Sequence, residues 1–209
     1  MLFSYLREKY GENEPIFVSD IRYEGVSDSR LRQQIMKLNE EGKLKRYDTG
    51  IYYIPKKSIF RSSAQLSFDK VIEAKYLCSS DGRCGYFNGL MFANLMGLTT
   101  QVSMAYDVVT NKATRDIRET TLARTRVILR KPRTPITEEN YKALQFLDLL
   151  KDIDTLSEIP ATEAQGRLIK YMNDAGLNFL DLEKYIDLYP DRIYKNLYKM
   201  RLLHGIFTQ

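Results

Sequence analysis

The sequence of 209 residues predicts an α+β protein, in which helices and a hairpin come first and a mixed α/β domain follows. Three observations support this class. A helix-spaced apolar run at 31–38 precedes two strand-like segments. Alternating polar and apolar residues at 101–110 and 125–130 predict strands of a small sheet. Helix-spaced apolar residues beyond Pro135 predict that the chain ends in a helical segment.

The first elements are two short helices. Leu2, Leu6 and Tyr10 form an apolar stripe that stops at Gly11, and a second helix is expected near Ser19. The third helix, at 28–41, is the best marked. Its apolar residues Leu31, Ile35 and Leu38 fall at i, i+4 and i+7, after a cap candidate at 27–29 and before Gly42.

A hairpin follows the third helix. Strand-like segments at 44–46 and 51–54 flank the turn-forming residues 47–50, and Pro55 ends the second strand. Helices followed by a hairpin are the elements of a winged helix-turn-helix, which we predict at 1–57. A serine-rich connector is expected at 58–67 and a second domain at 68–209.

The second domain combines a small sheet with helices. Another helix is expected around Val71 and Leu77, and a buried helix within the segment 85–97, with Asn88 as its cap and Gly97 as its stop. After the two predicted strands, helices are expected at 138–152, 162–174, 179–189 and 191–203.

Composition predicts a soluble, cytoplasmic protein. Hydrophobic residues make up 44% of the chain and charged residues 28%. No apolar run approaches the roughly 20 residues that span a bilayer, so no membrane partner is expected. The first ten residues lack the long apolar stretch and the cleavage site of a signal peptide.

Few groups are suited to catalysis or metal binding. The sequence has only Cys78, Cys84 and a single histidine, His204, too few for a four-ligand zinc site, so we expect no metal and no cofactor. We expect the two cysteines to be free thiols, because a cytosolic compartment keeps them reduced. A helix C-terminal position is the simplest interpretation of His204. The carboxylates from Glu138 to Asp187 are scattered at helix-surface spacings, so we do not expect an enzyme.

The third predicted helix carries residues suited to DNA. Its outward side chains are of types that pair with guanine, adenine or phosphate: Arg30, Gln33, Gln34 and Lys37. Ser27 and Ser29 would donate to phosphate near the helix start. The hairpin adds cations for the flanking backbone or minor groove: Lys43, Lys45 and Arg46. The alternative is a winged helix that contacts protein.

A second group of cations surrounds the predicted strand at 125–130. Arg124, Arg126 and Arg130 would share one side of it as an exposed basic ridge. With Lys131 and Arg133 they form a possible nucleic-acid surface. A solvated strand face is the ordinary alternative.

Several blocks of the sequence resemble the AbiEi family of abortive-infection antitoxins. Gly-Leu-Thr-Thr-Gln at 97–101 is the most specific part. The matching blocks lie at 50–57, 85–90, 94–102, 109–112, 127–133, 140–141 and 144–148.

The resemblance implies a winged-helix domain joined to an antitoxin domain, encoded beside a nucleotidyltransferase-like toxin. Such antitoxins repress their own operon by binding inverted repeats, and they neutralise the toxin in the type IV manner, which does not require a stable complex. The implied partners are therefore double-stranded operator DNA and this toxin. The basic ridge would contact DNA phosphates or shield an RNA substrate from the toxin.

Two other functions stay open. A plain winged-helix transcriptional regulator would use its C-terminal domain to sense a ligand or to oligomerise. A nuclease fused to a winged helix would need a carboxylate cluster for metal, and the sequence has no compact motif of that kind.

Overall fold

The structure, a computed structural model, describes residues 1–56 and 65–202. The described residues form a mixed α+β protein, as the sequence predicts. The chain divides into two compact units, unit 1 (Met1–Lys75) and unit 2 (Tyr76–Gln209). Most of the connector expected at 58–67, and His204, lie outside the described residues.

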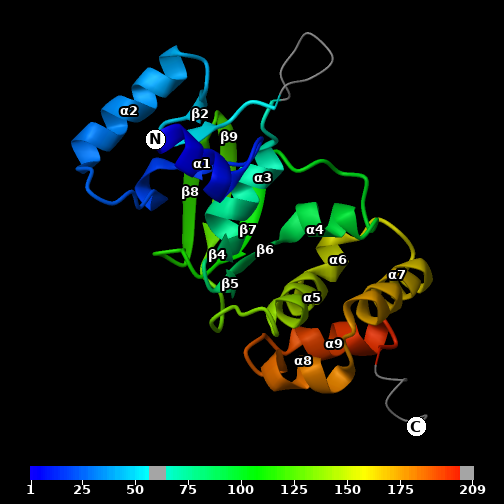
Figure 1. Ribbon diagram of the computed structural model, residues 1–209. Coiled ribbons are helices and arrows are strands. Elements are labelled where there is room, and N and C mark those ends of the chain that lie inside the picture. The colour runs from blue at the N-terminus through cyan, green and yellow to red at the C-terminus, as the bar shows by residue number, and fades with distance from the viewer. Residues whose placement is uncertain (57–64, 203–209) are drawn as a thin grey trace. The chain divides into compact units, whose positions relative to one another are not determined.

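Unit 1 combines short helices with a small antiparallel sheet (Figure 1). Its strands are ordered β1-β3-β2, so that the hairpin β2–β3 pairs with β1. Buried residues from α1, α2, β1 and the segments beside the hairpin form one core. In chain order the elements are α1 (Leu2–Tyr10), β1 (Ile16–Phe17), η1 (Val18–Asp20), α2 (Asp28–Glu40), β2 (Lys45–Asp48), β3 (Ile51–Tyr53) and α3 (Phe68–Ile72).

The helix α2 forms where the sequence predicts the third helix. Leu31 and Ile35 are buried in the core of unit 1, and Leu38 is half-buried. The Ser27 side chain accepts a hydrogen bond from the Arg30 backbone N–H, which satisfies one of the free donors at the helix start. Gly42 follows the helix with a φ of 72°, a conformation that favours glycine.

Two expectations for unit 1 need correction. The helix expected near Ser19 is only the 3₁₀ turn η1, because Ile21 already has an extended backbone as its side chain enters the core. The hairpin turn is also shorter than predicted. Strand β2 runs through Asp48 with an irregularity after Arg46, so the turn contains only Thr49 and Gly50.

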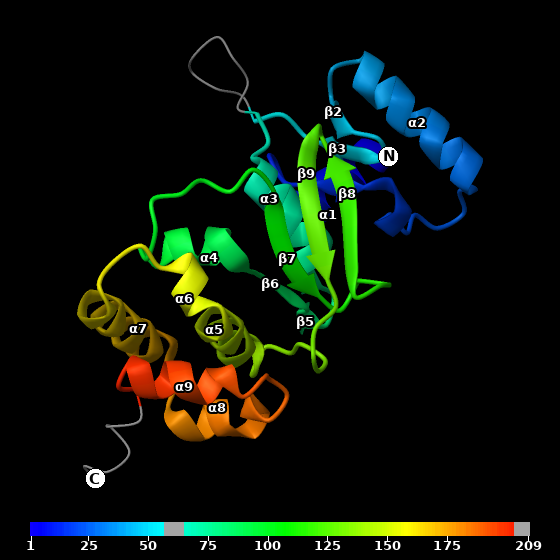
Figure 2. The same cartoon turned by 180° about the vertical axis from the view of Figure 1, so that it is seen from behind.

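Unit 2 contains a four-stranded sheet, ordered β6-β7-β9-β8, in which β7 and β9 run parallel and the other pairs run antiparallel (Figure 2). A π-helical turn, η2 (Glu73–Leu77), leads into it from unit 1. The strands of unit 2 are β4 (Cys78–Ser79), β5 (Gly82–Arg83), β6 (Gly85–Phe87), β7 (Tyr106–Thr110), β8 (Ile117–Leu122) and β9 (Thr125–Arg130), with β4 and β5 forming a separate hairpin.

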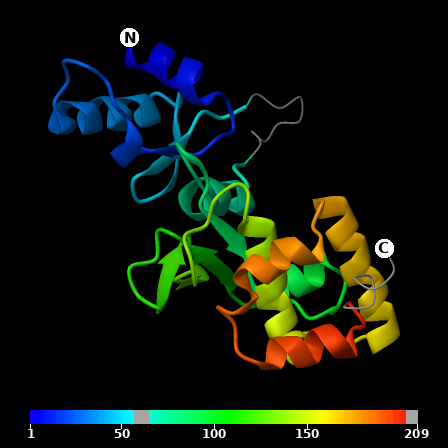
Figure 3. The ribbon, with the colours of Figure 1, turned by 90° about the horizontal axis from the view of Figure 1, so that it is seen from below.

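The helix α5 is the centre of the helical part of unit 2. Seen from below, the gold-to-red helices α7 to α9 lie around the yellow-green α5 (Figure 3). Nearly every residue of α5 from Ala143 to Leu150 is buried. The helices of unit 2 are α4 (Gly89–Leu95), α5 (Tyr141–Lys151), α6 (Ile153–Leu156), α7 (Ala161–Ala175), α8 (Phe179–Ile186) and α9 (Arg192–Lys199). Helices α5, α7, α8 and α9 lie close to the four positions predicted beyond Pro135, and the short α6 is not predicted by the sequence.

The helix expected within 85–97 forms as α4 and begins after Asn88, as predicted. The residues before it form strand β6, which pairs with β7 and which the sequence did not predict. Asn88 occupies the cap position, but its side chain makes no cap hydrogen bond and instead contacts Asp107. Glycine at 85 permits this strand, because a Cβ there would meet two backbone carbonyls.

The strand expected at 101–110 forms only at its second half, as β7. The first half has no strand partner among the described residues, and its first residue is bound by Glu158, whose carboxylate accepts hydrogen bonds from Thr99 and from the Gln101 side chain. Val102 and Met104 are 86% and 94% exposed rather than half-buried. The sequence also missed β8, which forms a hairpin with β9. Both cysteines are free thiols, as expected.

Candidate nucleic-acid interface and a polar cleft

The side of α2 that faces away from the core carries the polar residues singled out in the sequence. Five of them are exposed to solvent, and Gln34, nearer the buried side, is half-buried. Asp28 and Glu40 share the exposed surface, so it is mixed in charge. The exposed five are Ser27, Ser29, Arg30, Gln33 and Lys37.

The cations of the hairpin lie next to α2. The Asn39 side chain accepts a hydrogen bond of 3.1 Å from the Arg46 backbone N–H, which ties the end of α2 to β2. The Arg46 side chain donates to Thr49 at 3.2 Å, within the hairpin. Lys45 is exposed, and Lys43 forms an exposed ion pair with Glu41.

The five basic residues predicted as one surface in unit 2 are not equivalent. Arg124 precedes β9, in the turn after β8, with a φ of 68°. Arg126 forms an exposed ion pair with Glu119 on β8, and this hydrogen-bonded pairing raises the pKa of Arg126. Arg130 is half-buried and bound to Asp107 on β7. Pairing therefore neutralises two of the three arginines expected along the ridge.

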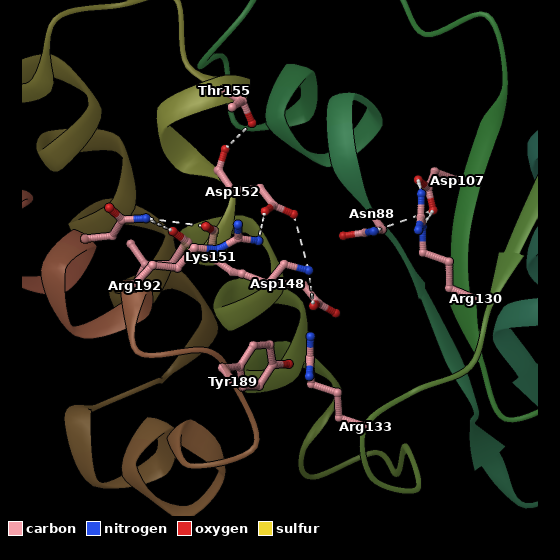
Figure 4. Close-up of polar contacts among 12 residues, drawn as sticks. Asn88, Asp107, Arg130, Arg133, Asp148, Lys151, Asp152, Thr155, Tyr189 and Arg192 are labelled. Atoms are coloured by element: carbon pink, nitrogen blue, oxygen red, sulfur yellow. Dashed lines mark hydrogen bonds and ion pairs between the residues drawn. The ribbon is translucent and has the colours of Figure 1, made fainter. Parts of the chain in front are cut away.

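A cleft of about 620 Å³ in unit 2 brings together three of these five cations, Arg130, Lys131 and Arg133, with polar residues that the sequence did not predict as site residues. One wall is formed by β7, β9 and the start of α4, and the other by α5 and α6 (Figure 4). Lys131 and Arg133, which follow β9, also line the cleft.

The sheet wall is organised around Asp107. The Arg130 guanidinium donates three hydrogen bonds of 2.8 to 3.0 Å to its carboxylate, and this bonding raises the pKa of Arg130. The backbone N–H of buried Asn88 donates to the Asp107 backbone carbonyl at 2.9 Å, and its side-chain amide donates to the Asp107 carboxylate at 3.5 Å. The pair is thereby held in a fixed orientation at the cleft surface.

The helical wall carries a chain of polar contacts. Asp148 is buried, accepts a hydrogen bond of 2.7 Å from the Tyr86 hydroxyl, and forms an ion pair of 3.2 Å with Lys151. Lys151 also pairs with Asp152, which binds Arg192 of α9 at 2.7 Å. Burial, and next the nearby charge of Asp148, hold the pKa of Tyr86 well above its ordinary value, so the hydroxyl remains a donor.

Arg133 enters the cleft below Asp148 (Figure 4). Its guanidinium carbon lies 4.7 Å from the centre of the Tyr189 ring, and one nitrogen donates to the Leu188 carbonyl at 2.8 Å. Tyr189 is itself fixed by a 3.1 Å hydrogen bond to the Leu144 carbonyl. The guanidinium is therefore oriented by an aromatic ring and a backbone carbonyl.

The sequence contains one signal for this wall. Asp148 interrupts a run of α5 in which Phe146, Leu147, Leu149 and Leu150 are all buried. A carboxylate in such a run must find partners inside the protein, because burying an unpaired charge is costly. The signal indicates an internal polar network but does not identify Tyr86, 62 residues away, as the partner.

Across residues 1–56 and 65–202, no group of three or more histidine, cysteine or acidic residues is placed to hold a metal ion. In the same ranges, no helix is both long and apolar enough to cross a membrane. Comparison with models of known protein families finds no match, and a search of curated proteins finds no similar sequence.

Proposed function

We propose that unit 1 is a winged helix-turn-helix that binds operator DNA in the cytoplasm, with α2 as the recognition helix. The order of its elements supports this assignment, since α1, β1, η1, α2 and the hairpin β2–β3 correspond to the successive elements of that fold. The observation that carries the proposal is the exposed face of α2. It combines long polar side chains with an apolar inner face that fixes the helix to its domain.

The exposed residues of α2 have complementary roles in this proposal. Arg30 is suited to two hydrogen bonds with guanine, and Gln33 to two with adenine. Lys37, one turn further along, is suited to phosphate. Ser27 already accepts a hydrogen bond as the helix cap, but its hydroxyl hydrogen is a separate donor that a phosphate oxygen can accept.

The hairpin supplies affinity more than sequence selection. Lys45 and Arg46 lie on the strand that is tied to the end of α2, so they would contact the DNA backbone beside the groove. Lys43 can exchange Glu41 for phosphate at little cost, because exposed ion pairs contribute little. A single recognition helix makes few base contacts, and an operator of inverted repeats would therefore bind two copies of the chain.

Operator binding is tested by fluorescence anisotropy at fixed salt. The probes are the DNA upstream of the gene and a shuffled duplex of equal length. We expect Arg30→Ala combined with Gln33→Ala to weaken operator binding by about 1–3 kcal/mol per lost base contact and to change shuffled-DNA binding much less. Unchanged operator affinity would remove α2 as the recognition helix.

The matched control for this experiment is Arg7→Ala. Arg7 is also an exposed arginine on a helix of unit 1, and its partner Glu12 is a surface group. The control removes the same charge without touching α2. We expect operator affinity to be retained, so a loss of equal size in the control would indicate general electrostatics rather than recognition by α2.

We propose further that the chain is the antitoxin of a type IV toxin–antitoxin system and represses its own operon. This part rests on the resemblance across residues 50–152, whose most specific segment is the one that Glu158 binds through Thr99 and Gln101. The antitoxin activity is assigned chiefly to unit 2. No enzymatic activity of the chain's own is proposed.

Co-expression with the neighbouring toxin tests the antitoxin assignment. The full chain should restore growth, and so should the variant with both Arg30→Ala and Gln33→Ala, because neutralisation is assigned to the other unit. A neighbouring gene unrelated to nucleotidyltransferases, or failure of the full chain to restore growth, would contradict the assignment.

One observation favours a second candidate, a transcriptional regulator that senses a ligand. The cleft of unit 2 lies within the size range of small-molecule sites, roughly 300–1,000 Å³. A ligand that changes operator affinity while the toxin has no effect on growth would support this function over the antitoxin.

A further inference from the structure

The cleft of unit 2 offers both polar and apolar surface to a ligand. Its apolar side chains come from the sheet wall, from the segment after β9 and from the helical wall, and they suit the carbon skeleton of a small molecule. They include Leu90, Ile128, Pro132 and Leu156. Asn88 adds a buried amide beside Asp107 (Figure 4).

Most carboxylates of the cleft already have a cationic partner. Arg130 binds both oxygens of Asp107. Lys151 lies between Asp148 and Asp152 and pairs with each at 3.2 Å. These groups satisfy one another, so a ligand gains little by replacing either partner.

Two cations of the cleft are placed differently. Among the residues that the structure describes, no carboxylate forms an ion pair with the side chain of Lys131 or Arg133. Arg133 is already oriented by Tyr189 and by the Leu188 carbonyl, and a guanidinium with five N–H donors retains several for a ligand. Asp116, the other carboxylate that lines the cleft, is exposed.

We propose that the cleft binds a small organic phosphate, with its phosphate group held by Arg133 and Lys131. The planar guanidinium matches two phosphate oxygens, and the lysine adds a point charge. The organic part lies against the apolar walls, with the Asn88 amide as a polar contact. This inference does not depend on operator binding, because it concerns the other unit and a separate measurement.

Isothermal titration calorimetry of the full chain tests the proposal. The probes are inorganic phosphate, AMP, glucose 6-phosphate and a single-stranded oligonucleotide, with adenosine and glucose as the counterparts of the two organic phosphates without phosphate. We expect saturable binding of at least one organic phosphate, tighter than that of inorganic phosphate, and no binding of its counterpart.

Two charge-removing variants locate the site. Arg133→Gln and Lys131→Gln should each weaken binding of the organic phosphate about tenfold or more. The matched control is Lys170→Gln, because Lys170 is an exposed cation of α7 that does not line the cleft. It should bind like the unmodified chain. Thermal unfolding without ligand shows whether each variant is folded. If loss of the Tyr189 contact destabilises Arg133→Gln, the binding measured with Lys131→Gln decides the test.

Three results would overturn the proposal. The first is that no organic phosphate binds with a Kd below about 1 mM. The second is that binding is equal in both variants and in the control. The third is that only a ligand other than an organic phosphate binds through these cations. That ligand would be inorganic phosphate, or a single-stranded oligonucleotide when AMP does not bind. That last result would indicate a plain anion site or a nucleic-acid surface.

Discussion

Replacing Gly85 by alanine tests how tightly β6 is held in the sheet of unit 2. An added Cβ would lie 2.5 Å from the Tyr76 carbonyl oxygen, 2.8 Å from the Val109 carbonyl oxygen and 3.2 Å from the Leu77 Cα. All three are backbone atoms of two separate segments, so no side chain can rotate to make room. Overpacking of this kind costs about 1–3 kcal/mol, and we expect the upper end, about 3 kcal/mol.

Urea unfolding followed by circular dichroism measures this change. The matched control is Gly166→Ala in the same unit. Gly166 lies inside α7, and a Cβ there would meet nothing within 4 Å. The control should gain up to about 1 kcal/mol, because alanine is the better helix former. A Gly85→Ala variant as stable as the unmodified chain would refute the close approach on which this reasoning depends.

Three further predictions concern single contacts. Hydrogen bonds from Thr99, from Gln101 and from the Thr100 backbone lower the pKa of Glu158 from 4.5 to about 2. The contribution of Glu158 to the stability of the fold is therefore complete above pH 4.5 and is lost as the pH falls toward 2. Glu158→Gln should therefore lower the thermal midpoint at pH 7, and the difference in midpoint between this variant and the unmodified chain should shrink below pH 4.5. A difference in midpoint that is independent of pH would contradict this. Ala123→Asn with Arg124→Gly should raise the free energy of unfolding by about 1–2 kcal/mol, since both turn residues have positive φ, and an unchanged midpoint would argue against that turn. Tyr86→Phe should cost about 1–2 kcal/mol in urea unfolding, because buried Asp148 loses a donor. Tyr194→Phe, at a hydroxyl bound to exposed Asp187, should change little, and equal losses would contradict the account of the buried pair.

The elements that the sequence predicts well are those specified by neighbouring residues. The helix α2 has a capping serine, apolar residues at helical spacing and a glycine just past its end, and it forms at the predicted position. The helices beyond Pro135 follow the same rule. Local spacing decides such elements, because their apolar stripe and their ends are encoded within a few turns.

The elements that the sequence misplaces depend on distant residues. Residues 101–105 alternate like a strand, but Glu158, 57 residues beyond Gln101, holds the preceding turn. Gly85 is followed by an apolar run typical of a helix, but pairing with Thr110 makes it the start of β6. Such contacts leave no periodic signal near the residues that they control.

The candidate cleft shows the same limit. Arg126 and Arg130 share a spacing typical of one exposed strand face, but each meets a carboxylate that only the pairing of strands brings near. Glu119 comes from antiparallel β8 and Asp107 from parallel β7. Because the order of strands is not encoded locally, the sequence predicts the cations but not their neutralisation.

The salt dependence of operator binding tests the central claim, that α2 contacts DNA, most directly. The logarithm of the affinity should fall linearly with the logarithm of salt concentration, and Lys37→Gln should reduce the magnitude of that slope by about 1 as one phosphate contact is lost. Lys9→Gln removes an exposed lysine of α1 and should leave the slope unchanged. Equal slopes for Lys37→Gln and the unmodified chain would contradict the assignment of α2 to the DNA interface.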